Sequence, residues 1–259
     1  MSLTPPPRFF RGLVGALGFL LVWEAFSRSG LVDQRYFPPP SIVLARLAEL
    51  LGDRAFLLDV IASLLAWAIA LLISIAIAVP AGLLLGSVPA VRVATRAIVE
   101  FLRPIPSVAL IPLAIVLVGN GPDTKIALAV YAAVWPILFN TIYALDEIDP
   151  VMVDTARSFG HGRARVMFTV ALPNSAPFVL TGIRMSAAVA LILVVSTEFL
   201  AGGTSGLGSF VLDASTGAGR MDLVLAGTLV AGLIGLAINE ALEQVHRRGL
   251  RWSTTQEAT

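Results

Sequence analysis

Six long apolar stretches with few charged residues divide the chain. A helix needs roughly 20 residues to cross the hydrocarbon core of a membrane, and each stretch approaches that length. Pro104, Pro106 and Pro112 interrupt the third, and no small-residue cleavage site follows the first, so the first is not a cleavable signal. The pattern predicts an all-α polytopic membrane protein with transmembrane helices over about residues 9–26, 60–85, 98–118, 125–145, 177–200 and 223–241.

One strongly polar segment, residues 146–173, lies between the fourth and fifth stretches. Its acids, arginines and histidine are too costly to expose to lipid, so it must lie outside the membrane. The pattern predicts a helix over 152–159, a sharp turn at the glycines that follow, and a second short helix over 163–170 that stops before Pro173. A further short helix is expected over 42–51, with Ser41 as its N-cap, at the membrane interface.

Composition agrees with a membrane protein and excludes several other classes. Hydrophobic residues make up 57% and charged residues 14% of the chain, and the mean hydropathy is +0.86. A soluble enzyme usually carries about 25% charged residues. The formal net charge of +1 offers no basic field for nucleic acid. Because there is no cysteine, a disulfide framework and a thiolate zinc site are excluded, and no other metal site is predicted.

The basic residues predict an orientation. Twelve of the 18 Lys and Arg residues lie on the cytoplasmic side if both termini are placed there, as the positive-inside rule favours. We therefore expect a short cytoplasmic tail over residues 1–8, a permease domain over 9–246 and a cytoplasmic C-terminal tail over 247–259. No internal repeat or soluble domain boundary is found.

The polar segment resembles a known motif. Asp154-Thr155-Ala156, then Gly160 after three residues, then Val170-Ala171-Leu172-Pro173 after nine more, resembles the EAA motif in the membrane subunits of ATP-binding-cassette importers. Asp stands here for the usual Glu, and Thr155 for Ala. The resemblance implies a cytoplasmic coupling helix that docks on an ATPase subunit. Apolar side chains should supply the docking strength, because exposed ion pairs are weak. The coupling residues expected are Asp154, Ala156, Arg157, Phe159, Gly160, Arg163 and Pro173.

A second resemblance narrows the branch. Residues 102–113, with Arg103 before the prolines, resemble the third span of nitrate, sulfonate and taurine permeases, and the similarity runs from about residue 37 to residue 232. A basic residue expected near Ala66 is missing. The resemblance implies the type I importer fold, with five core spans plus an N-terminal one, in the bacterial inner membrane. It also implies alternating access and these partners: a second copy of the chain, two ATP-binding-cassette ATPase subunits, and a periplasmic or lipid-anchored binding protein.

Several residues are candidates for the pathway. The prolines of the third stretch indicate either a helix that lines the pathway or a kinked helix packed on its neighbours. Glu198, at the outer end of the fifth stretch, is either a gate residue or a structural one that binds amides of the following loop. The glycines at 206–208 form either a phosphate cradle or, as we expect because no helix clearly starts there, a tight turn. Arg103 and Arg184 either attract an anion or anchor at the interface. The candidate pathway or gate residues are Pro104, Pro106, Ser107, Pro112, Trp135, Asn140 and Glu198.

The predicted function is that of the membrane subunit of an ATP-driven importer for a small, anionic solute such as a sulfonate, taurine, nitrate or a related carboxylate. A permease for a thiamine-precursor pyrimidine or another vitamin-like solute is the alternative. An ion-coupled carrier or an intramembrane enzyme would need more intramembrane charge than Glu198 supplies. The chain has no GxxxxGK[ST] loop, so we expect no catalytic residue and no cofactor in it, with ATP and Mg bound by the partner ATPase.

Overall fold

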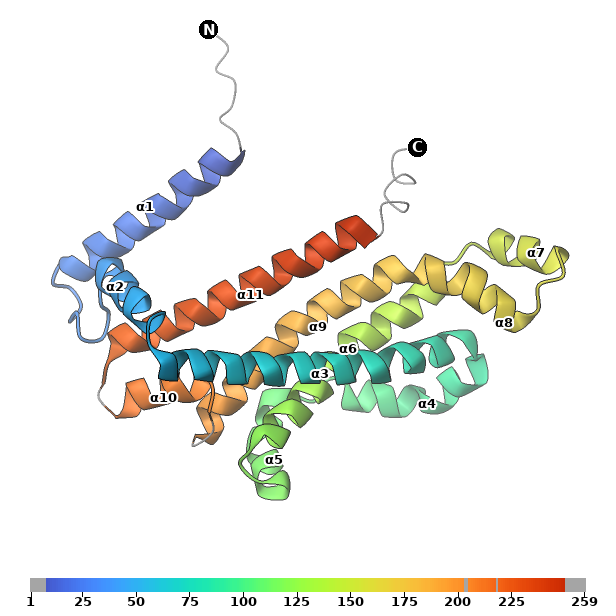
Figure 1. Cartoon of the computed structure of the whole chain (residues 1–259). Helices are drawn as coiled ribbons and strands as arrows, with labels where there is room; N and C mark the ends of the chain where they lie inside the picture. The colour runs from blue at the N-terminus through green and yellow to red at the C-terminus, as the bar shows by residue number, and fades with distance from the viewer. Residues whose placement is uncertain (1–7, 203–204, 218, 250–259) are drawn as a thin grey trace, which may run out of the picture.

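The computed structural model describes residues 8–202, 205–217 and 219–249 (Figure 1). Within these ranges every regular element is helical, as the hydrophobic pattern predicts. The elements are α1 (Arg8–Arg28), α2 (Pro40–Leu50), α3 (Arg54–Ser87), α4 (Pro89–Leu102), the 3-10 helix η1 (Ser107–Leu110), α5 (Ile111–Val118), α6 (Pro122–Asp146), α7 (Pro150–Ser158), α8 (Arg163–Val166), the π-helical turn η2 (Met167–Ala171), α9 (Leu172–Ala201), α10 (Leu207–Thr216) and α11 (Met221–Gly249).

Among the described residues, four helical stretches are long and apolar enough to cross a membrane: α3, α6, Arg163–Ala201 and α11. Helix α4 and the η1–α5 segment qualify together as a fifth span, which is bent by 76° where Pro104 and Pro106 interrupt the helix. Helix α1 coincides with the first predicted span, but the total of six spans stays a prediction. Figure 1 shows α7 and α8 at one end of the bundle and α10 at the other.

Helices α3, α6 and α9 form the centre of the bundle and pack closely through small residues. A Cβ at Gly82 would lie 2.6 Å from Cβ of Thr141, and a Cβ at Gly182 would lie 2.9 Å from Cβ of Asn140. Glycine at these two positions therefore allows α6 to approach α3 and α9 closely, as is common between membrane helices. Fully buried alanines occupy the same contact: Ala70, Ala129, Ala133 and Ala190.

A second cluster joins α2, the start of α3, α10 and α11 at the α10 end, around the buried side chains of Val43, Phe56 and Leu207. The Arg46 guanidinium of α2 hydrogen bonds to Glu49 and, at 3.0 Å, to Asp222 of α11. These bonds raise the pKa of Arg46, so the guanidinium stays charged and holds the two helices together.

Most of helix α1 lies apart from the bundle, and the part near its C-terminal end contacts Phe37 and α2 (Figure 1). The predicted N-cap of α2 is wrong. The helix begins at Pro40 with Pro39 as its N-cap, because proline favours the first helical turn. The Ser41 hydroxyl instead donates to Glu24 of α1 at 2.9 Å and thus joins α1 to α2.

The predicted stop before Pro173 is also wrong, because the chain is helical without a break from Arg163 to Ala201. The π-helical turn over 167–171 comes directly before Pro173, which lies in the first turn of α9. Proline lacks an amide hydrogen and its ring crowds the preceding turn, and the wider π turn accommodates both without ending the helix. The polar segment is therefore joined rigidly to the fifth predicted span.

Candidate functional site

Helices α7 and α8 form a short projection, here called the α7–α8 segment (Pro150–Val166), beyond the apolar helices. The Asp149 carboxylate caps α7 by accepting a hydrogen bond from the amide of Val151 at 2.8 Å. The turn between the helices is the one predicted: Gly160 has a φ of +80°, which side chains with a Cβ rarely adopt. Gly162 has a φ of −69°, a value open to any residue.

Apolar side chains cover the outer surface of the α7–α8 segment. Phe159 is 80% exposed and Val151 is 67% exposed, although neither carries a polar group that favours water. Asp154 and Arg157 lie beside them with a 3.6 Å contact between exposed side chains, and Ala156 is buried underneath. A cavity of about 680 Å³ separates the segment from the α3–α4 turn, and Arg157 and Arg163 line it.

This arrangement brings six of the predicted coupling residues onto one projection, and Pro173 follows in the first turn of α9. An exposed apolar surface with charges around it is typical of a surface that binds another protein. Within the described residues no group of three His, Cys, Asp or Glu side chains could hold a metal ion.

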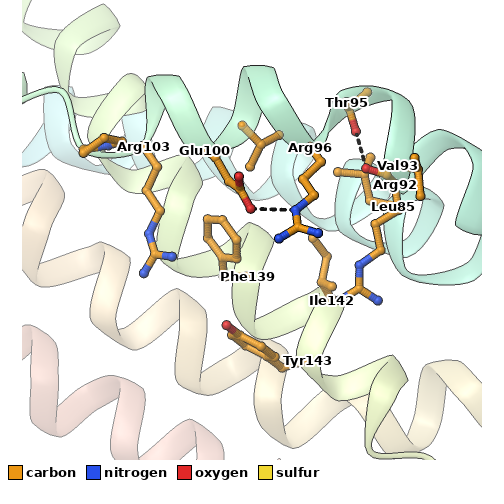
Figure 2. A pocket seen from close by; sticks show the side chains of 12 residues that line it. Leu85, Arg92, Val93, Thr95, Arg96, Glu100, Arg103, Phe139, Ile142 and Tyr143 are labelled. Carbon is orange, nitrogen blue, oxygen red and sulfur yellow. Dashed lines mark hydrogen bonds and ion pairs between the residues drawn. The ribbon is translucent and has the colours of Figure 1, made fainter.

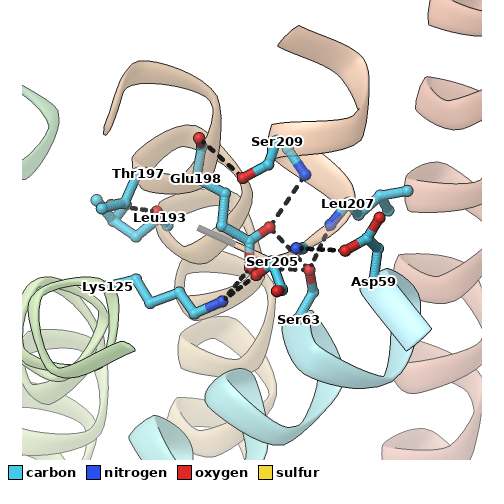
Figure 3. Close-up of polar contacts among 11 residues, drawn as sticks. Asp59, Ser63, Lys125, Leu193, Thr197, Glu198, Ser205, Leu207 and Ser209 are labelled. Atoms are coloured by element: carbon cyan, nitrogen blue, oxygen red, sulfur yellow. Dashed lines mark hydrogen bonds and ion pairs between the residues drawn. The ribbon is translucent and has the colours of Figure 1, made fainter. Parts of the chain in front are cut away.

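A buried charged cluster lies at the α10 end (Figure 3). Glu198 of α9 is fully buried and Lys125 of α6 is 3% exposed, and the Lys125 ammonium lies 2.6 Å from the Glu198 carboxylate. The Ser63 hydroxyl of α3 donates to the same carboxylate at 2.7 Å. Each charge is therefore paired inside the protein, as buried charges must be if they are not to destabilise it.

The charged cluster also holds the beginning of α10. The amides of Gly206, Leu207 and Gly208 donate to Asp59, Ser63 and Glu198, at 2.9, 2.8 and 3.0 Å. These are the amides that a helix leaves without internal partners, so three side chains from two other helices cap α10. The expectation of a tight turn without a helix was wrong. Glu198 does accept a hydrogen bond from a backbone amide that follows it, but this amide, of Gly208, lies in the first turn of α10 and not in a loop. The role of Glu198 as a gate stays a prediction.

The glycines of this corner leave room for the carboxylate. A Cβ at Gly206 would lie 2.2 Å from the Glu198 carboxylate, and one at Gly208 would lie 2.2 Å from the Val195 carbonyl oxygen. Lys125, Ser63 and Asp59 were not among the predicted site residues. Lys125 is the single lysine of the chain and lies at the outer end of the fourth predicted span, shortly after Pro122. Glu198 lies at the outer end of the fifth predicted span. Their opposite charges at the same end of neighbouring spans could have predicted that they pair.

The remaining pathway candidates lie in other places. Pro104 and Pro106 occupy the break between α4 and η1, Ser107 begins η1, and Pro112 lies in the first turn of α5. Trp135 packs edge-on against Tyr131 with ring centres 5.9 Å apart. Asn140 donates to the Pro136 carbonyl of its own helix at 2.8 Å, where α6 meets α9. The structure does not bring these residues together with Glu198.

A pocket of about 820 Å³ lies between α4 and α6, here called the α4–α6 pocket (Figure 2). Figure 2 shows arginine side chains of α4 reaching toward the aromatic rings of α6. The Arg103 guanidinium lies 4.3 Å from the centre of the Phe139 ring. Among the predicted pathway residues, Pro104 contributes to the lining of this pocket.

Comparison with known sequences places the chain among transport proteins. Residues 78–248 match the family model described as "Binding-protein-dependent transport system inner membrane component". The taurine transport system permease protein TauC of Escherichia coli is 31% identical over 245 residues, which cover 92% of this chain and 88% of that protein. A bicarbonate transport system permease protein, CmpB of Synechocystis, is 26% identical over 93% of this chain and 87% of its own length.

Solved structures share the fold. The inward-facing MetNI methionine ABC transporter has a TM-score of 0.65 at 20% identity, and the match covers 73% of this chain and 94% of that one. A bacterial ABC transporter involved in the import of the acidic polysaccharide alginate also has a TM-score of 0.65, at 16% identity, over 93% of this chain and 95% of that one. At these identities the likeness concerns the fold, which is the type I importer fold predicted.

Proposed function

Since this chain belongs to the family of binding-protein-dependent transport system inner membrane components, we propose that it forms, as a homodimer, the pathway of an ATP-driven importer in the bacterial inner membrane. Two ATP-binding-cassette ATPase subunits bind ATP and Mg and dock on the α7–α8 segments. A periplasmic or lipid-anchored binding protein delivers the solute at the α10 end. Both termini and the α7–α8 segment then face the cytoplasm.

The exposed apolar surface of the α7–α8 segment is the observation that carries this proposal. The chain has no nucleotide-binding loop of its own, so the energy of ATP must reach it through a contact with another subunit. Phe159 and Val151 offer apolar area for that contact, and Asp154, Arg157 and Arg163 set its register. Because α8 continues into α9, a displacement of the segment moves the membrane helix with it.

The mechanism is alternating access. ATP binding closes the ATPase dimer and draws the two α7–α8 segments together, which opens the pathway toward the α10 end; hydrolysis and release of ADP reverse the movement. The permease needs only a difference in its partners' affinity for the two conformations.

The solute is a small anion. Relatives are taurine and bicarbonate permeases, which supports a sulfonate, taurine, nitrate or related carboxylate. A permease for a thiamine-precursor pyrimidine or similar vitamin-like solute is the alternative, since the binding protein makes the selection. An ion-coupled carrier or an intramembrane enzyme is disfavoured, because the buried charges at Lys125 and Glu198 neutralise each other.

The test compares two glycines of one turn. Gly160→Leu introduces a side chain at a φ of +80°, where it is strained by about 1–2 kcal/mol. Gly162→Leu is the matched control, because its φ of −69° accepts leucine and no atom lies within 4 Å of the added Cβ. Both variants are expressed in the natural host, and capture of an ATP-binding-cassette ATPase by the tagged permease and solute uptake are measured.

The unmodified chain and Gly162→Leu are expected to capture the ATPase and to support uptake. Gly160→Leu should insert into the membrane in a normal amount and lose most uptake. If the unmodified chain captures no ATPase, or if Gly160→Leu transports at the unmodified rate, the α7–α8 segment is not the coupling contact.

A further inference from the structure

One side of α4 carries charged residues at intervals of about one helical turn. Arg92, Arg96, Glu100 and Arg103 are separated by four, four and three residues, so they share a side of the helix, and all four line the α4–α6 pocket. Charged groups at membrane depth are stable only where they meet water or a partner. Each charge that lines the pocket must therefore have a partner in the protein, meet water or bind a solute.

Two of these arginines are already neutralised. The Asp146 carboxylate binds Arg92 through two hydrogen bonds of 2.8 Å, and Glu100 accepts a 2.7 Å bond from Arg96. The Arg103 side chain has no hydrogen bond or acidic partner anywhere in the described part of the chain; its contact is with the Phe139 ring. The pocket thus holds one uncompensated positive charge.

Arg184 shows what a structural arginine looks like in the same protein. Its guanidinium donates to Asn239 at 2.8 Å and pairs with Glu243, so it joins α9 to α11. The sequence allowed either anchoring or attraction of an anion for both Arg103 and Arg184. The hydrogen bonds of Arg184 are satisfied by neighbouring residues of the protein. The Phe139 ring holds the Arg103 guanidinium by its face, which leaves the N–H groups at its edge free to donate to a ligand.

The walls around this charge are largely apolar. Leu85, Val99, Phe139 and Ile142 face the pocket, and its volume of about 820 Å³ exceeds that of a small inorganic ion. A ligand that fits one positive charge beside apolar walls is a small organic molecule with one negative charge, such as an alkyl sulfonate or carboxylate.

We propose that the α4–α6 pocket is a solute-binding site for a small organic monoanion, with Arg103 as the cation that binds its charged group. The inference rests on the proposed transport function. It adds that the permease itself contacts the solute, in the half of the bundle nearer to α7 and α8, where α3 ends at Ser87 and α6 ends at Asp146. A solute released from the binding protein would meet this site before it leaves the pathway.

The absence of natural cysteine makes a direct test possible. Val99→Cys places one thiol in the pocket, and Ile98→Cys places one on an exposed position of α4 outside the lining. In membrane vesicles that contain the full chain with its natural partners, each thiol reacts with anionic 2-sulfonatoethyl methanethiosulfonate or with its cationic trimethylammonium analogue. The ratio of the two rates measures the local potential and is compared between the two positions.

At Val99→Cys the anionic reagent should be favoured about tenfold more than at Ile98→Cys, because Val99 and the positively charged Arg103 line the same pocket and Ile98 does not. Adding Arg103→Gln should remove this preference, and Arg103→Lys should keep most of it. Arg54→Gln, an exposed arginine at the α10 end, is the matched control and should leave the ratio unchanged. Millimolar butanesulfonate should slow labelling at Val99→Cys and lose this effect with Arg103→Gln.

Equal rate ratios at the two positions, an unchanged ratio with Arg103→Gln, or no labelling at Val99→Cys and at a second reporter, Thr95→Cys, would each overturn the proposal. These measurements do not depend on ATPase capture. A negative result here, together with a captured ATPase, would rule out the solute site and leave the proposed importer function supported. A positive result without a captured ATPase would support the solute site and contradict the proposed coupling to an ATPase.

Discussion

The two ends of the bundle use glycine and charge in opposite ways. At the α10 end, glycines are required for space, because a Cβ at Gly208 would lie 2.2 Å from a backbone oxygen. At the α7–α8 end, Gly160 has open space around it and is required for its φ of +80°. Lys125 and Glu198 are buried and fully paired, whereas Asp154 and Arg157 are exposed and weakly paired.

This difference separates residues that hold the permease together from residues that are left for a partner. A buried pair is costly to break because the remaining charge has no water around it. An exposed pair contributes little, since water and salt screen it. Substitutions at the α10 end should therefore lower the stability of the isolated permease, and substitutions on the α7–α8 segment should lower only its interaction with other subunits.

The largest effect is expected from breaking the buried pair. Lys125→Met should destabilise the purified permease by about 3–5 kcal/mol, because Glu198 then carries a buried charge without its cation. Thermal unfolding in detergent, followed by the loss of the monodisperse peak in size-exclusion chromatography, measures this. The double variant Lys125→Met/Glu198→Met should recover part of the loss; if the single variant unfolds at the unmodified temperature, the charged cluster does not stabilise the α10 end.

The second largest effect is expected from adding a side chain to Gly208, at the closely packed start of α10. Gly208→Ala forces a Cβ against the Val195 carbonyl and should destabilise the permease by about 1–3 kcal/mol. Gly232→Ala in α11 is the matched control, because no atom lies within 4 Å of its added Cβ and alanine favours a helix. The same unfolding assay should show a lower temperature for the first variant only. Equal shifts would mean that α10 can move away from α9 at little cost.

Phe159→Ala should leave the stability of the isolated permease within about 0.5 kcal/mol of the unmodified chain, because the ring is 80% exposed. The same change should lower the amount of ATPase captured by the tagged permease about tenfold or more, as expected for a buried aromatic residue in an interface. A marked loss of stability without loss of capture would show that this ring packs within the permease.

The smallest effect is expected from Asp154→Asn. The Asp154 side chain is 73% exposed and its contact with Arg157 is 3.6 Å, so unfolding should not change measurably. Capture of the ATPase should weaken by no more than about fivefold, since charge sets the register of the contact and apolar area supplies its strength. Titration of detergent-solubilised permease with the ATPase measures this; a loss larger than that of Phe159→Ala would reverse the assignment.

The lengths of the apolar stretches located the long helices, and the glycines of the polar segment located the turn at Gly160, because both features depend on local sequence alone. The sequence did not reveal that the helix continues through Pro173. The π turn that accommodates this proline has no recognisable signature in the neighbouring residues. It also did not reveal α10, whose first amides are capped by Asp59, Ser63 and Glu198 from other helices. Such long-range caps arise only when the helices pack.

The π turn at 167–171 has one more consequence. Such a turn holds one more residue than an α-helix needs, so it fixes how α7 and α8 are rotated about the axis of α9. Each residue of an α-helix turns the chain by about 100°. The loss of one residue here would turn the whole α7–α8 segment toward another side of the molecule, although its own sequence would be unchanged.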